Sequence, residues 1–461
     1  MRTAEIAVVG GGVLALAITQ QLASSGQDVR VVAPFEVPRR SASRAAGAML
    51  GVFSEVSSYD EPARRTRDVA ERLLARRSYD PWLDELGLAV TPGLFVIANP
   101  EGREDAAELA AIEQVAAEFG GAAQRVGATD IPGLAPDARC PAYAAVHLAA
   151  EGTVDADRLM MALERATENR RISTTVERIE LGDSGPVTLH FGDGELLTAG
   201  QVVLAAGVGT MALIGDAELG LPALFGGRGV SLLLRSAVQL PTGVRTPNRA
   251  FACGLHVLPR GEGTLYVGAT NRLSTAPDLA REATLGEVDT LLRGAVAEVS
   301  TALRDAELLA VQVGHRAVTA DHLPLVGRTR DPRVLIATGT YRNGVLLAPR
   351  VAELIGAELS RPGSQEAHDW SPRREVLPVD LAAVLSRAAA GLVATGVGSS
   401  AQPWGRDLEL AQVVEVTLGL LTGSDVDRDR LARKASRLLA RAPLEEALPL
   451  LFDLVARHGQ R

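Results

Sequence analysis

The sequence is poor in lysine and in cysteine, and each shortage excludes a class of chemistry. Lys434 is the only lysine among 461 residues, so the main body of the chain has no amine for Schiff-base catalysis. The two cysteines, Cys140 and Cys253, are too few for a disulfide framework or a metal site. We expect both to be small buried hydrophobic residues in a reducing cytoplasm.

A surplus of positive charge and a long hydrophobic run are also missing. The formal net charge of -9, with no cluster of basic residues, argues against a nucleic-acid or anionic-membrane surface. No stretch reaches the roughly 20 unbroken apolar residues of a transmembrane helix. The apolar N-terminus is interrupted by three glycines and lacks a strongly basic start, which argues against a signal peptide. We therefore expect a cytoplasmic globular protein of two or three domains, with neither nucleic acid nor membrane as a partner.

The apolar run that opens the chain ends in glycines. Ile6 to Val9 is typical of a buried strand, and Val13 to Ala23 is typical of a helix packed on it. The spacing Gly10-x-Gly12-x-x-Ala15 indicates the turn that binds the pyrophosphate of a dinucleotide. The first glycine permits the tight turn, the second lets phosphate approach bare backbone, and the small third residue lets the helix lie close to the strand. The positive end of the helix then faces the phosphates.

Two further segments indicate close approach of the backbone to a cofactor. Ser41 to Leu50, which reads SASRAAGAML, is dense in small residues. Beside a nucleotide fold this density lets backbone contact a flat group, and a tightly packed Ala-rich helix is an equally good interpretation. The run from Gly200 ends in Ala205-Ala206-Gly207, as a buried parallel strand does when it delivers the chain to a cofactor. The nucleotide-binding part is therefore discontinuous in sequence.

The remaining pattern predicts helices around an antiparallel insertion. Pro62 to Arg77 is expected to be one helix, and Pro81 is expected to open a separate short one. Between Leu221 and Ala317 the period changes to that of strands separated by turns. Arg333 to Ala337 is then one more buried strand, followed by a glycine turn and an apolar helix from Val345. This last unit mirrors the strand, turn and helix at the N-terminus.

Several segments carry the pattern of a known family, in that family's order. They are the Gly10 fingerprint, SASRAAGAML, EGTVDADRL at 151–159, and above all GHRAVTADHLPLVG at 314–327 with TGTYRNGVLLAP at 338–349. On these segments the chain resembles the glycine oxidase branch of the FAD-dependent D-amino-acid oxidase superfamily, the group that includes the thiamine-pathway oxidase. The resemblance runs from about residue 4 to about Arg374, where WSPRR looks like the family's ending.

The resemblance implies non-covalently bound FAD and a small amino-acid-like substrate with a carboxylate. In the family an arginine at the position of Arg316 holds that carboxylate, Arg342 matches a second arginine near the substrate, and His256 stands where a tyrosine contacts the carboxylate. His315 is expected to face away, because neighbours on a strand point to opposite sides. The cofactor-binding residues expected from the fingerprint and the matched segments are Gly10, Gly12, Ala15, Ser43, Arg44, Met49, Val176, Ala206, Gly207, Asn343, Gly344 and Val345.

Three positions depart from the family's pattern. The second strand ends in Ala33, where the family has an acid that binds the adenosine ribose, which predicts weak or substoichiometric FAD binding. Glu36 is either a substitute for that acid or a solvated loop residue. His256 either keeps a hydrogen bond to the carboxylate and titrates near neutrality, or it satisfies backbone as a structural histidine. With Asn271 in place of an apolar residue, the pocket is more polar than one built for glycine, which favours a larger or N-substituted glycine-like amine.

The predicted fold class is α/β. A Rossmann-like FAD-binding domain is interleaved with a mostly antiparallel substrate-domain sheet, and an α-helical extension follows at the C-terminus. The expected boundaries are 1–90, 140–220 and 310–374 for the FAD-binding domain, 91–139 and 221–309 for the substrate-binding domain, and 377–461 for the extension. The apolar rows of the extension need burial, either within the chain or in a homo-oligomer or partner-subunit interface.

Three functions are compatible with these observations. The first is FAD-dependent oxidation of the CH-NH or CH-NH2 group of glycine or a glycine-like amino acid, by hydride transfer from the α-carbon to give an imine. The second is an amino-acid dehydrogenase that uses another electron acceptor. The third is a catalytically weak subunit with a flavoprotein fold that acts through its helical tail. Ala33 favours the third function, and Arg316 with Arg342 opposes it.

Overall fold

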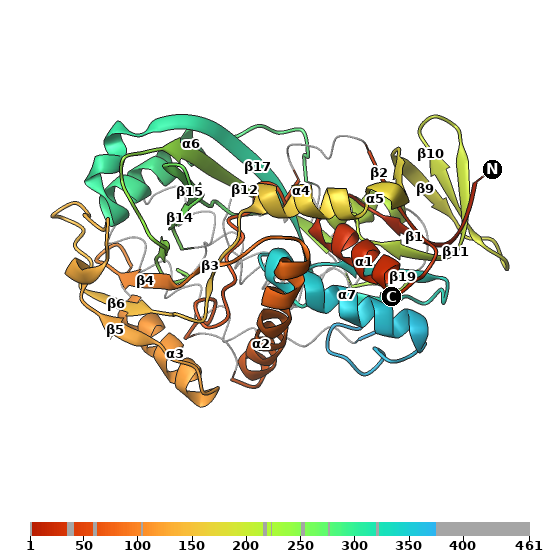
Figure 1. Cartoon of the computed structure of the whole chain (residues 1–461), viewed down its shortest axis with the longest axis horizontal. Helices are drawn as coiled ribbons and strands as arrows, with labels where there is room; N and C mark the ends of the chain where they lie inside the picture. The colour runs from red at the N-terminus through yellow and green to blue at the C-terminus, as the bar shows by residue number, and fades with distance from the viewer. Residues whose placement is uncertain are drawn as a thin grey trace, which may run out of the picture.

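Two β-sheets lie side by side and form the body of the molecule (Figure 1). The computed structural model describes residues 2–34, 41–58, 62–102, 105–214, 219–222, 224–249, 254–274, 277–319 and 322–374. Cys253, Glu36 and the helical extension expected at 377–461 lie outside these residues. Cys140 is a buried free thiol, as predicted.

The first sheet, sheet A, has a parallel centre. Its strand order is β18-β19-β11-β1-β2-β8, and the β9-β10 hairpin joins it through β10, which pairs with β11. Ile6 and Val8 of β1 pack into one hydrophobic core, whereas Ala7 and Val9 pack into another on the opposite face. This burial on both faces is typical of a parallel strand. The strands are β1 (Arg2–Val9), β2 (Val29–Ala33), β8 (Arg171–Ser173), β9 (Val176–Glu180), β10 (Val187–Phe191), β11 (Leu196–Leu204), β18 (Leu325–Arg328) and β19 (Val334–Thr338).

Four helices share the core on one face of sheet A (Figure 1). They are α1 (Val13–Ser24), α2 (Pro62–Glu85), α4 (Ala156–Ala166) and α7 (Gly344–Ser360), and the short α5 (Thr210–Ile214) packs on the opposite face. The prediction of a helix break before Pro81 is wrong, because α2 continues through it. Tyr79, Trp82 and Leu83 are buried on either side of the proline. Their packing holds the helix together despite the backbone hydrogen bond that proline removes.

The second sheet, sheet B, is antiparallel except where β13 runs parallel to β4, which confirms the predicted architecture. Its order is β16-β12-β15-β14-β13-β4-β6-β5, and β17 pairs with β12. Its strands are β4 (Leu94–Ala98), β5 (Gln124–Val126), β6 (Ala144–His147), β12 (Leu224–Arg235), β13 (Gly243–Arg245), β14 (His256–Pro259), β15 (Thr264–Gly268), β16 (Arg272–Ser274) and β17 (Glu307–Thr319). The remaining α-helices and strands of the described residues are α3 (Asp105–Glu118), α6 (Leu285–Gly294) and the small β3 (Thr91–Pro92) with β7 (Gly152–Thr153).

Strand pairing bears on the predicted domain boundaries. A boundary at 140 assigns β6 to the FAD-binding part, whereas β6 pairs with β4 and β5 of sheet B. A boundary at 310 divides β17, which pairs with β12 along most of its length. Both strands belong to sheet B because their hydrogen-bonding partners do, and those partners are distant in sequence. The domain division itself stays a prediction.

The parallel strands of sheet A bring three turns to one edge. β1 pairs in parallel with β11, and β11 pairs in parallel with β19, so their carboxyl ends point the same way. Each strand is followed within three residues by a glycine at positive φ, namely Gly10, Gly207 and Gly339. Only glycine adopts this backbone conformation without strain. These three turns form one side of the cavity that contains the candidate site.

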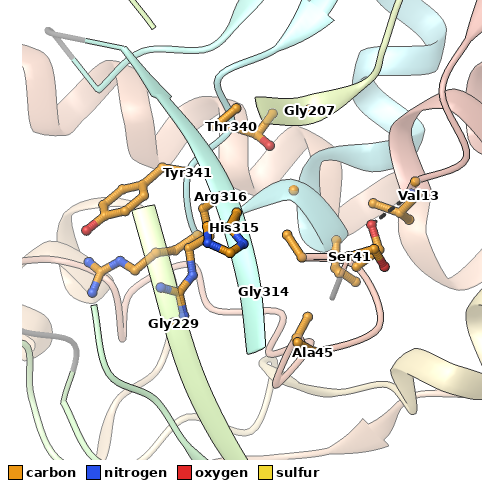
Figure 2. Close-up of a pocket in the computed structure, with 18 of the residues that line it drawn as sticks. Val13, Ser41, Ala45, Gly207, Gly229, Gly314, His315, Arg316, Thr340 and Tyr341 are labelled. Atoms are coloured by element: carbon orange, nitrogen blue, oxygen red, sulfur yellow. Dashed lines mark hydrogen bonds between the residues drawn. The ribbon is translucent and has the colours of Figure 1, made fainter. Parts of the chain in front are cut away.

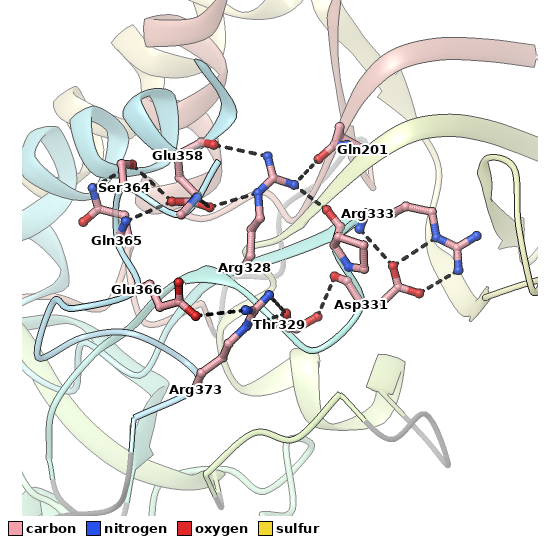
Figure 3. A network of polar contacts seen from close by, with 12 residues as sticks. Gln201, Arg328, Thr329, Asp331, Arg333, Glu358, Ser364, Gln365, Glu366 and Arg373 are labelled. Carbon is pink, nitrogen blue, oxygen red and sulfur yellow. Dashed lines mark hydrogen bonds and ion pairs between the residues drawn. The ribbon is translucent and has the colours of Figure 1, made fainter. Parts of the chain in front are cut away.

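A buried ion pair holds the C-terminal end of α7 to sheet A (Figure 3). Arg328 Nε of β18 lies 2.9 Å from Glu358 Oε1 of α7, and the two side chains are 10% and 2% exposed. Arg328 Nη1 also donates to Gln201 Oε1 at 2.7 Å. The Glu358 carboxylate accepts from the backbone N–H groups of Gly363 and Gln365. Both buried charges are therefore paired and hydrogen-bonded.

Removing one partner of this buried ion pair should destabilise the protein. Glu358→Ala leaves Arg328 buried without its counter-ion, so we expect the free energy of unfolding to fall by about 3–5 kcal/mol. Glu353→Ala on the same helix is the matched control, because Glu353 is 42% exposed and its pair with Arg350 is solvated. That variant should change stability by less than about 1 kcal/mol. Urea denaturation of both variants makes the comparison, and equal losses would contradict the assignment.

Candidate active site

A cavity of about 950 Å³ lies between the turns of sheet A and the inner side of sheet B (Figure 2). Glycine turns after the strands of sheet A form part of the wall, and the charged lining residues are Glu55, Arg245, Arg316 and Arg342. Most of the predicted site residues meet here, although they come from distant parts of the chain. Those that line the cavity are Gly10, Gly12, Ser43, Met49, Ala206, Gly207, His256, Arg316, Arg342, Asn343, Gly344 and Val345.

The turn after β1 is crowded and presents backbone to the cavity. A Cβ atom at Gly10 would lie 2.4 Å from the carbonyl oxygen of Ala205, so a side chain there would force β1 and β11 apart. Gly12 is the N-cap of α1 and provides no side-chain acceptor. Val13 N donates to Ser43 Oγ at 3.0 Å. The first turn of α1 thus directs N–H groups and a positive dipole end toward a ligand.

The segment 41–50 is not a helix. It forms turns followed by irregular backbone, and its Ser41 to Met49 stretch lines the cavity almost continuously. A Cβ atom on Gly314 would lie 3.0 Å from both Ala42 Cα and Ala45 Cβ, so the segment packs directly on β17. The Ala-rich helix is therefore excluded, and close approach of this backbone to a cofactor stays a prediction.

Glu151 anchors the loop that follows this segment through hydrogen bonds to its backbone. Its Oε1 accepts the N–H groups of Val52, Phe53 and Ser54 at 3.0, 2.5 and 3.0 Å, and its Oε2 accepts the Ser54 hydroxyl at 2.5 Å. The carboxylate is fully buried, and burial raises its pKa although the hydrogen bonds act in the opposite direction. This anchored loop ends at Glu55, a residue that the sequence pattern did not single out and that lines the cavity.

Arg316 of β17 extends across the neighbouring strand β12 (Figure 2). A Cβ atom at Gly229 would lie only 2.4 Å from Arg316 Nη2, so the glycine makes room for the guanidinium. Nη1 of Arg316 donates to Thr270 O at 3.2 Å and to Asn271 Oδ1 at 3.0 Å. Both acceptors are neutral. Within the described parts of the chain, no carboxylate lies within ion-pair distance of Arg316.

Arg342 belongs to a second cationic cluster. Its Nη2 lies 3.2 Å from Glu55 Oε2, and Arg245 Nη1 forms a close ion pair with Glu55 Oε1. Asn248 Oδ1 accepts from both arginines, at 2.7 Å from Arg245 and 3.2 Å from Arg342. Burial alone would raise the pKa of Glu55, but Arg245 and then Arg342 outweigh it and lower the pKa to about 2. Glu55 is therefore ionised at neutral pH.

His256 of β14 is a buried, neutral member of the cavity wall. Burial lowers its pKa from 6.5 to about 3, and the nearby Arg245 and Arg316 act in the same direction. The expectation that it titrates near neutrality is therefore wrong. Its Nδ1 lies 3.0 Å from Gly254 O, and its ring stacks on Tyr266 with centroids 5.6 Å apart. His256 therefore has the structural role of hydrogen-bonding to the backbone, and its ring also lines the cavity.

His315 lines the cavity as well, although it was expected to face away from the site (Figure 2). The ring is 5% exposed, and its Nε2 is a buried atom without a hydrogen-bond partner among the described residues. Burial, and then Arg228, lower its pKa. Strand alternation does place it opposite Arg316, but the cavity continues around the edge of β17 to Leu279 and Ala280. A local periodicity argument could not reveal this shape.

Three predicted cofactor residues lie outside the cavity. The Arg44 side chain turns outward, where it pairs with Glu164 at 2.8 Å and with Asp157 at 3.5 Å. Val176 lies in the core on the far side of sheet A, and Ala15 is fully buried between α1 and the sheet. Ala15 serves the close helix packing that the fingerprint requires. Direct cofactor contact by Arg44 or Val176 has no support in this geometry.

Comparisons with known proteins identify the family. The family model DAO, described as FAD dependent oxidoreductase, matches residues 5–358. The chain belongs to this family. The glycine oxidase of Geobacillus kaustophilus (strain HTA426) is 30% identical over 383 residues, covering 80% of this chain and 95% of the relative. The crystal structure of glycine oxidase from Geobacillus kaustophilus has a TM-score of 0.70 and 27% identity, covering 82% of this chain and all of that one.

The names of a second group of similar proteins refer to tRNA biosynthesis rather than to glycine oxidation. The tRNA 5-methylaminomethyl-2-thiouridine biosynthesis bifunctional protein MnmC of Burkholderia orbicola (strain MC0-3) is 28% identical over 429 residues. The match covers 85% of this chain and 62% of the relative. Both groups are compatible with an amine or amino-acid oxidoreductase.

The cavity of this FAD dependent oxidoreductase suits its cofactor. Bare backbone at Gly10 and Gly12, the start of α1, and the unpartnered His315 Nε2 all call for a ligand rich in polar atoms. Ala33 is buried at the end of β2, and Pro34 beside it lines the cavity. Since Glu36 lies outside the described residues, the acid that would bind the ribose is not identified, and weak FAD binding stays a prediction.

No helix in the described part of the chain is long and apolar enough to cross a membrane. The cytoplasmic location, the absence of nucleic-acid partners and any assembly through the C-terminal extension stay predictions.

A side chain at position 229 should displace Arg316 without unfolding the protein. The atom that a Cβ would meet is the flexible end of Arg316, so Gly229→Ala can fold while the guanidinium moves. We expect carboxylate ligands of the FAD-loaded protein to bind at least about ten-fold more weakly, a loss of about 1.4 kcal/mol. Titration of the flavin absorption spectrum measures the binding. Gly286→Ala is the control, because a Cβ there meets nothing within 4 Å, and its binding should be unchanged.

Burial of neutral His256 should make the protein less stable in acid. Its pKa is about 3 in the folded protein against an ordinary value of 6.5, so between these pH values the unfolded chain takes up a proton that the folded chain does not. The contribution is fully present above pH 6.5 and is lost as the pH falls toward 3. Below pH 6, wild-type stability should fall by up to about 1.4 kcal/mol per pH unit more steeply than that of His256→Gln. Parallel slopes in urea denaturation at several pH values would contradict this.

Proposed function

We propose that this FAD-dependent oxidoreductase oxidises the carbon–nitrogen bond of glycine or of a glycine-like, N-substituted amino acid. The observation that carries the proposal is Arg316, whose guanidinium lines the cavity and contacts only neutral oxygens among the described residues. A planar guanidinium with spare donors is the partner that a carboxylate needs for two parallel hydrogen bonds. Similarity to glycine oxidase over 80% of the chain supports the same substrate class.

The chemistry requires orientation more than acid or base catalysis. Bound FAD supplies a two-electron acceptor, which takes a hydride from the substrate α-carbon while the nitrogen loses a proton, so that the carbon–nitrogen bond becomes an imine that water hydrolyses. Arg316 would hold the carboxylate and thereby direct the α-carbon. His256 is a poor base because its pKa is about 3, and Glu55 is held by two arginines. The lining is therefore suited to a substrate that arrives as a neutral amine.

The backbone near α7 would support the electron-accepting end of the cavity. Asn343 is the N-cap of α7 and its side chain makes no capping hydrogen bond, while Gly344 and Val345 of the first turn line the cavity. In this proposal, the positive end of the helix would face the part of the cofactor where negative charge develops on reduction. Release of peroxide in air would assign oxygen as the final acceptor, and its absence would favour a dehydrogenase with a separate electron carrier.

A role in tRNA modification is the second candidate, and the similarity to the Burkholderia MnmC protein over 85% of the chain favours it. The net charge of -9 argues against it, because tRNA binding calls for a basic surface. A filter-binding measurement with total tRNA at low salt distinguishes the two. Salt-sensitive binding at micromolar protein would support the second candidate, and no binding would leave free amino acids as the substrate class.

Replacement of Arg316 should abolish efficient oxidation. For Arg316→Ala we expect a loss of about 2–5 kcal/mol of transition-state binding, a fall in kcat/KM of about thirty-fold or more. Arg316→Lys keeps the charge and should restore only part of the lost kcat/KM, because an ammonium cannot form the bidentate pair with a carboxylate. Anaerobic bleaching of the flavin by glycine and N-methylglycine measures the rate. The control is Arg235→Ala, an exposed arginine of the same sheet. Turnover of Arg316→Ala at the control rate would refute the proposal.

A further inference from the structure

Arg260, the residue directly after β14, binds the backbone of two segments that are distant from it in sequence. Its Nη2 donates to Ala46 O at 2.8 Å and to Gly47 O at 3.1 Å, and its Nη1 donates to Val154 O at 2.5 Å. All three acceptors are peptide carbonyls. Hydrogen bonds from a charged donor are stronger than those from a neutral one, so this guanidinium fixes the two segments firmly.

Arg260 approaches the segment 45–49 from the side away from the main cavity. It lines a smaller hollow of about 180 Å³ together with Arg44, Asp155 and Asp157, whereas 45–49 lines the main cavity. Asp157 pairs with Arg44 at 3.5 Å. Within the described ranges, neither aspartate lies within ion-pair distance of Arg260. The segment therefore lies between the cavity and a guanidinium whose charge is directed at peptide carbonyls.

The carbonyl contacts fix the direction of the N–H groups of this segment. Its peptide bonds are trans, so each N–H points away from the carbonyl before it. The carbonyl oxygens of residues 45, 46, 47 and 48 are held in turn by the Tyr266 hydroxyl, by Arg260 twice and by the N–H of Val154. The N–H groups of residues 46–49 have no acceptor among the described residues, and they point toward the cavity.

Ala48 adopts a backbone conformation that brings neighbouring N–H groups together. Its φ is 49°, in the left-handed region that residues with a side chain avoid. Such a residue within a turn places successive N–H groups on one side of the backbone, where they can surround an acceptor. Strain of this kind persists only where neighbouring contacts hold it. Here the bonds from Arg260 to the two preceding carbonyls supply those contacts.

We infer that Arg260 is a positioning residue for the cofactor: it holds the carbonyls of Ala46 and Gly47 so that the N–H groups of residues 46–49 bind acceptor atoms of the flavin ring. Its positive charge polarises these peptides and makes their N–H groups stronger donors. Reduction adds negative charge to the flavin ring, so the donors favour the reduced form over the oxidised form. The inference rests on FAD dependence, which the family shows, and not on the amine proposed above.

The reduction potential of the bound flavin tests this inference, because looser packing alone would weaken the binding of oxidised and reduced FAD equally. For Arg260→Met we expect the dissociation constant to rise at least about ten-fold for oxidised FAD and about a hundred-fold for reduced FAD. The extra factor of ten corresponds to a fall in potential of about 30 mV for a two-electron couple. Fluorescence of FAD released on dilution of the FAD-loaded protein measures the first constant, and equilibration with a reference redox dye measures the potential.

Two further substitutions separate the charge of Arg260 from its hydrogen bonds. Arg260→Lys keeps the charge and should recover most of the fall in potential. Arg260→Gln keeps an amide donor without charge and should show the fall. Equal potentials in these two variants would overturn the inference, and so would an unchanged potential in Arg260→Met. The comparison of Lys with Gln decides the matter even if Arg260→Met does not fold.

Variants at two distant positions control for lost charge and lost stability. Arg235→Met removes an exposed arginine of sheet B, and Glu358→Ala removes one partner of the buried pair with Arg328. Neither position lines the cavity, so both variants should keep the wild-type potential. An equal fall in Glu358→Ala would overturn the inference, because general destabilisation would then explain the effect.

The measurements also separate this inference from the proposed function, because no amine enters them. If every amine fails to reduce the flavin while Arg260→Met lowers the potential, the proposed function falls and the role of Arg260 stands. If glycine reduces the flavin while the potential of Arg260→Met equals that of the wild type, the proposed function stands and the inference falls.

Discussion

The parallel pairing of β1 with β11, and of β11 with β19, is the constraint on which the rest of the molecule depends. It directs the carboxyl ends of three buried strands to one edge of sheet A, where each is followed by a glycine at positive φ. The first turns of α1 and α7 begin at that same edge. The cofactor end of the cavity is therefore made mainly of backbone. A Cβ atom at Gly10 would accordingly collide with the main chain of Ala205, directly after β11.

The opposite wall of the cavity depends on side-chain charge. Sheet B contributes Arg245 and Arg316, the loop after residue 50 contributes Glu55, and the turn between β19 and α7 contributes Arg342. Buried charges in proteins are stable only when they are paired or hydrogen-bonded, and each of these groups has such partners. The partners differ in kind: Arg245 has a carboxylate, whereas Arg316 has only neutral oxygens. The kind of partner thus distinguishes a structural arginine from one that is suited to bind a ligand.

Local patterns in the sequence revealed the backbone half of the site. The glycine fingerprint, the small residues of 41–50 and the second strand, turn and helix near Val345 all depend on short-range spacing, and each unit contributes residues to the cavity lining. Resemblance to a family identified Arg316 and Arg342. Glu55 and Arg245 were missed because they are 190 residues apart and neither belongs to a periodic pattern. Arg44 was misplaced for a related reason: its partner Glu164 lies on α4, and no local rule predicts the pairing.

Tertiary packing also overrode local propensity where the two conflicted. Pro81 is a helix breaker by its chemistry, yet α2 continues through it because buried residues flank it on both sides. The position of His315 followed the alternation of a strand, but the cavity extends to both faces at that edge. In both cases the outcome depended on the three-dimensional shape of the folded protein, which cannot be deduced from residue spacing.

The carboxylate of Glu151 has a consequence for how the site discriminates among ligands. By accepting three successive backbone N–H groups and one hydroxyl, it holds the segment before Glu55 in a single conformation. Glu55 therefore extends from an anchored backbone toward Arg245 and Arg342. Selection is then a matter of preorganised fixed charge rather than of induced fit. A ligand of the wrong charge is therefore disfavoured by charged groups that are already in position before it binds.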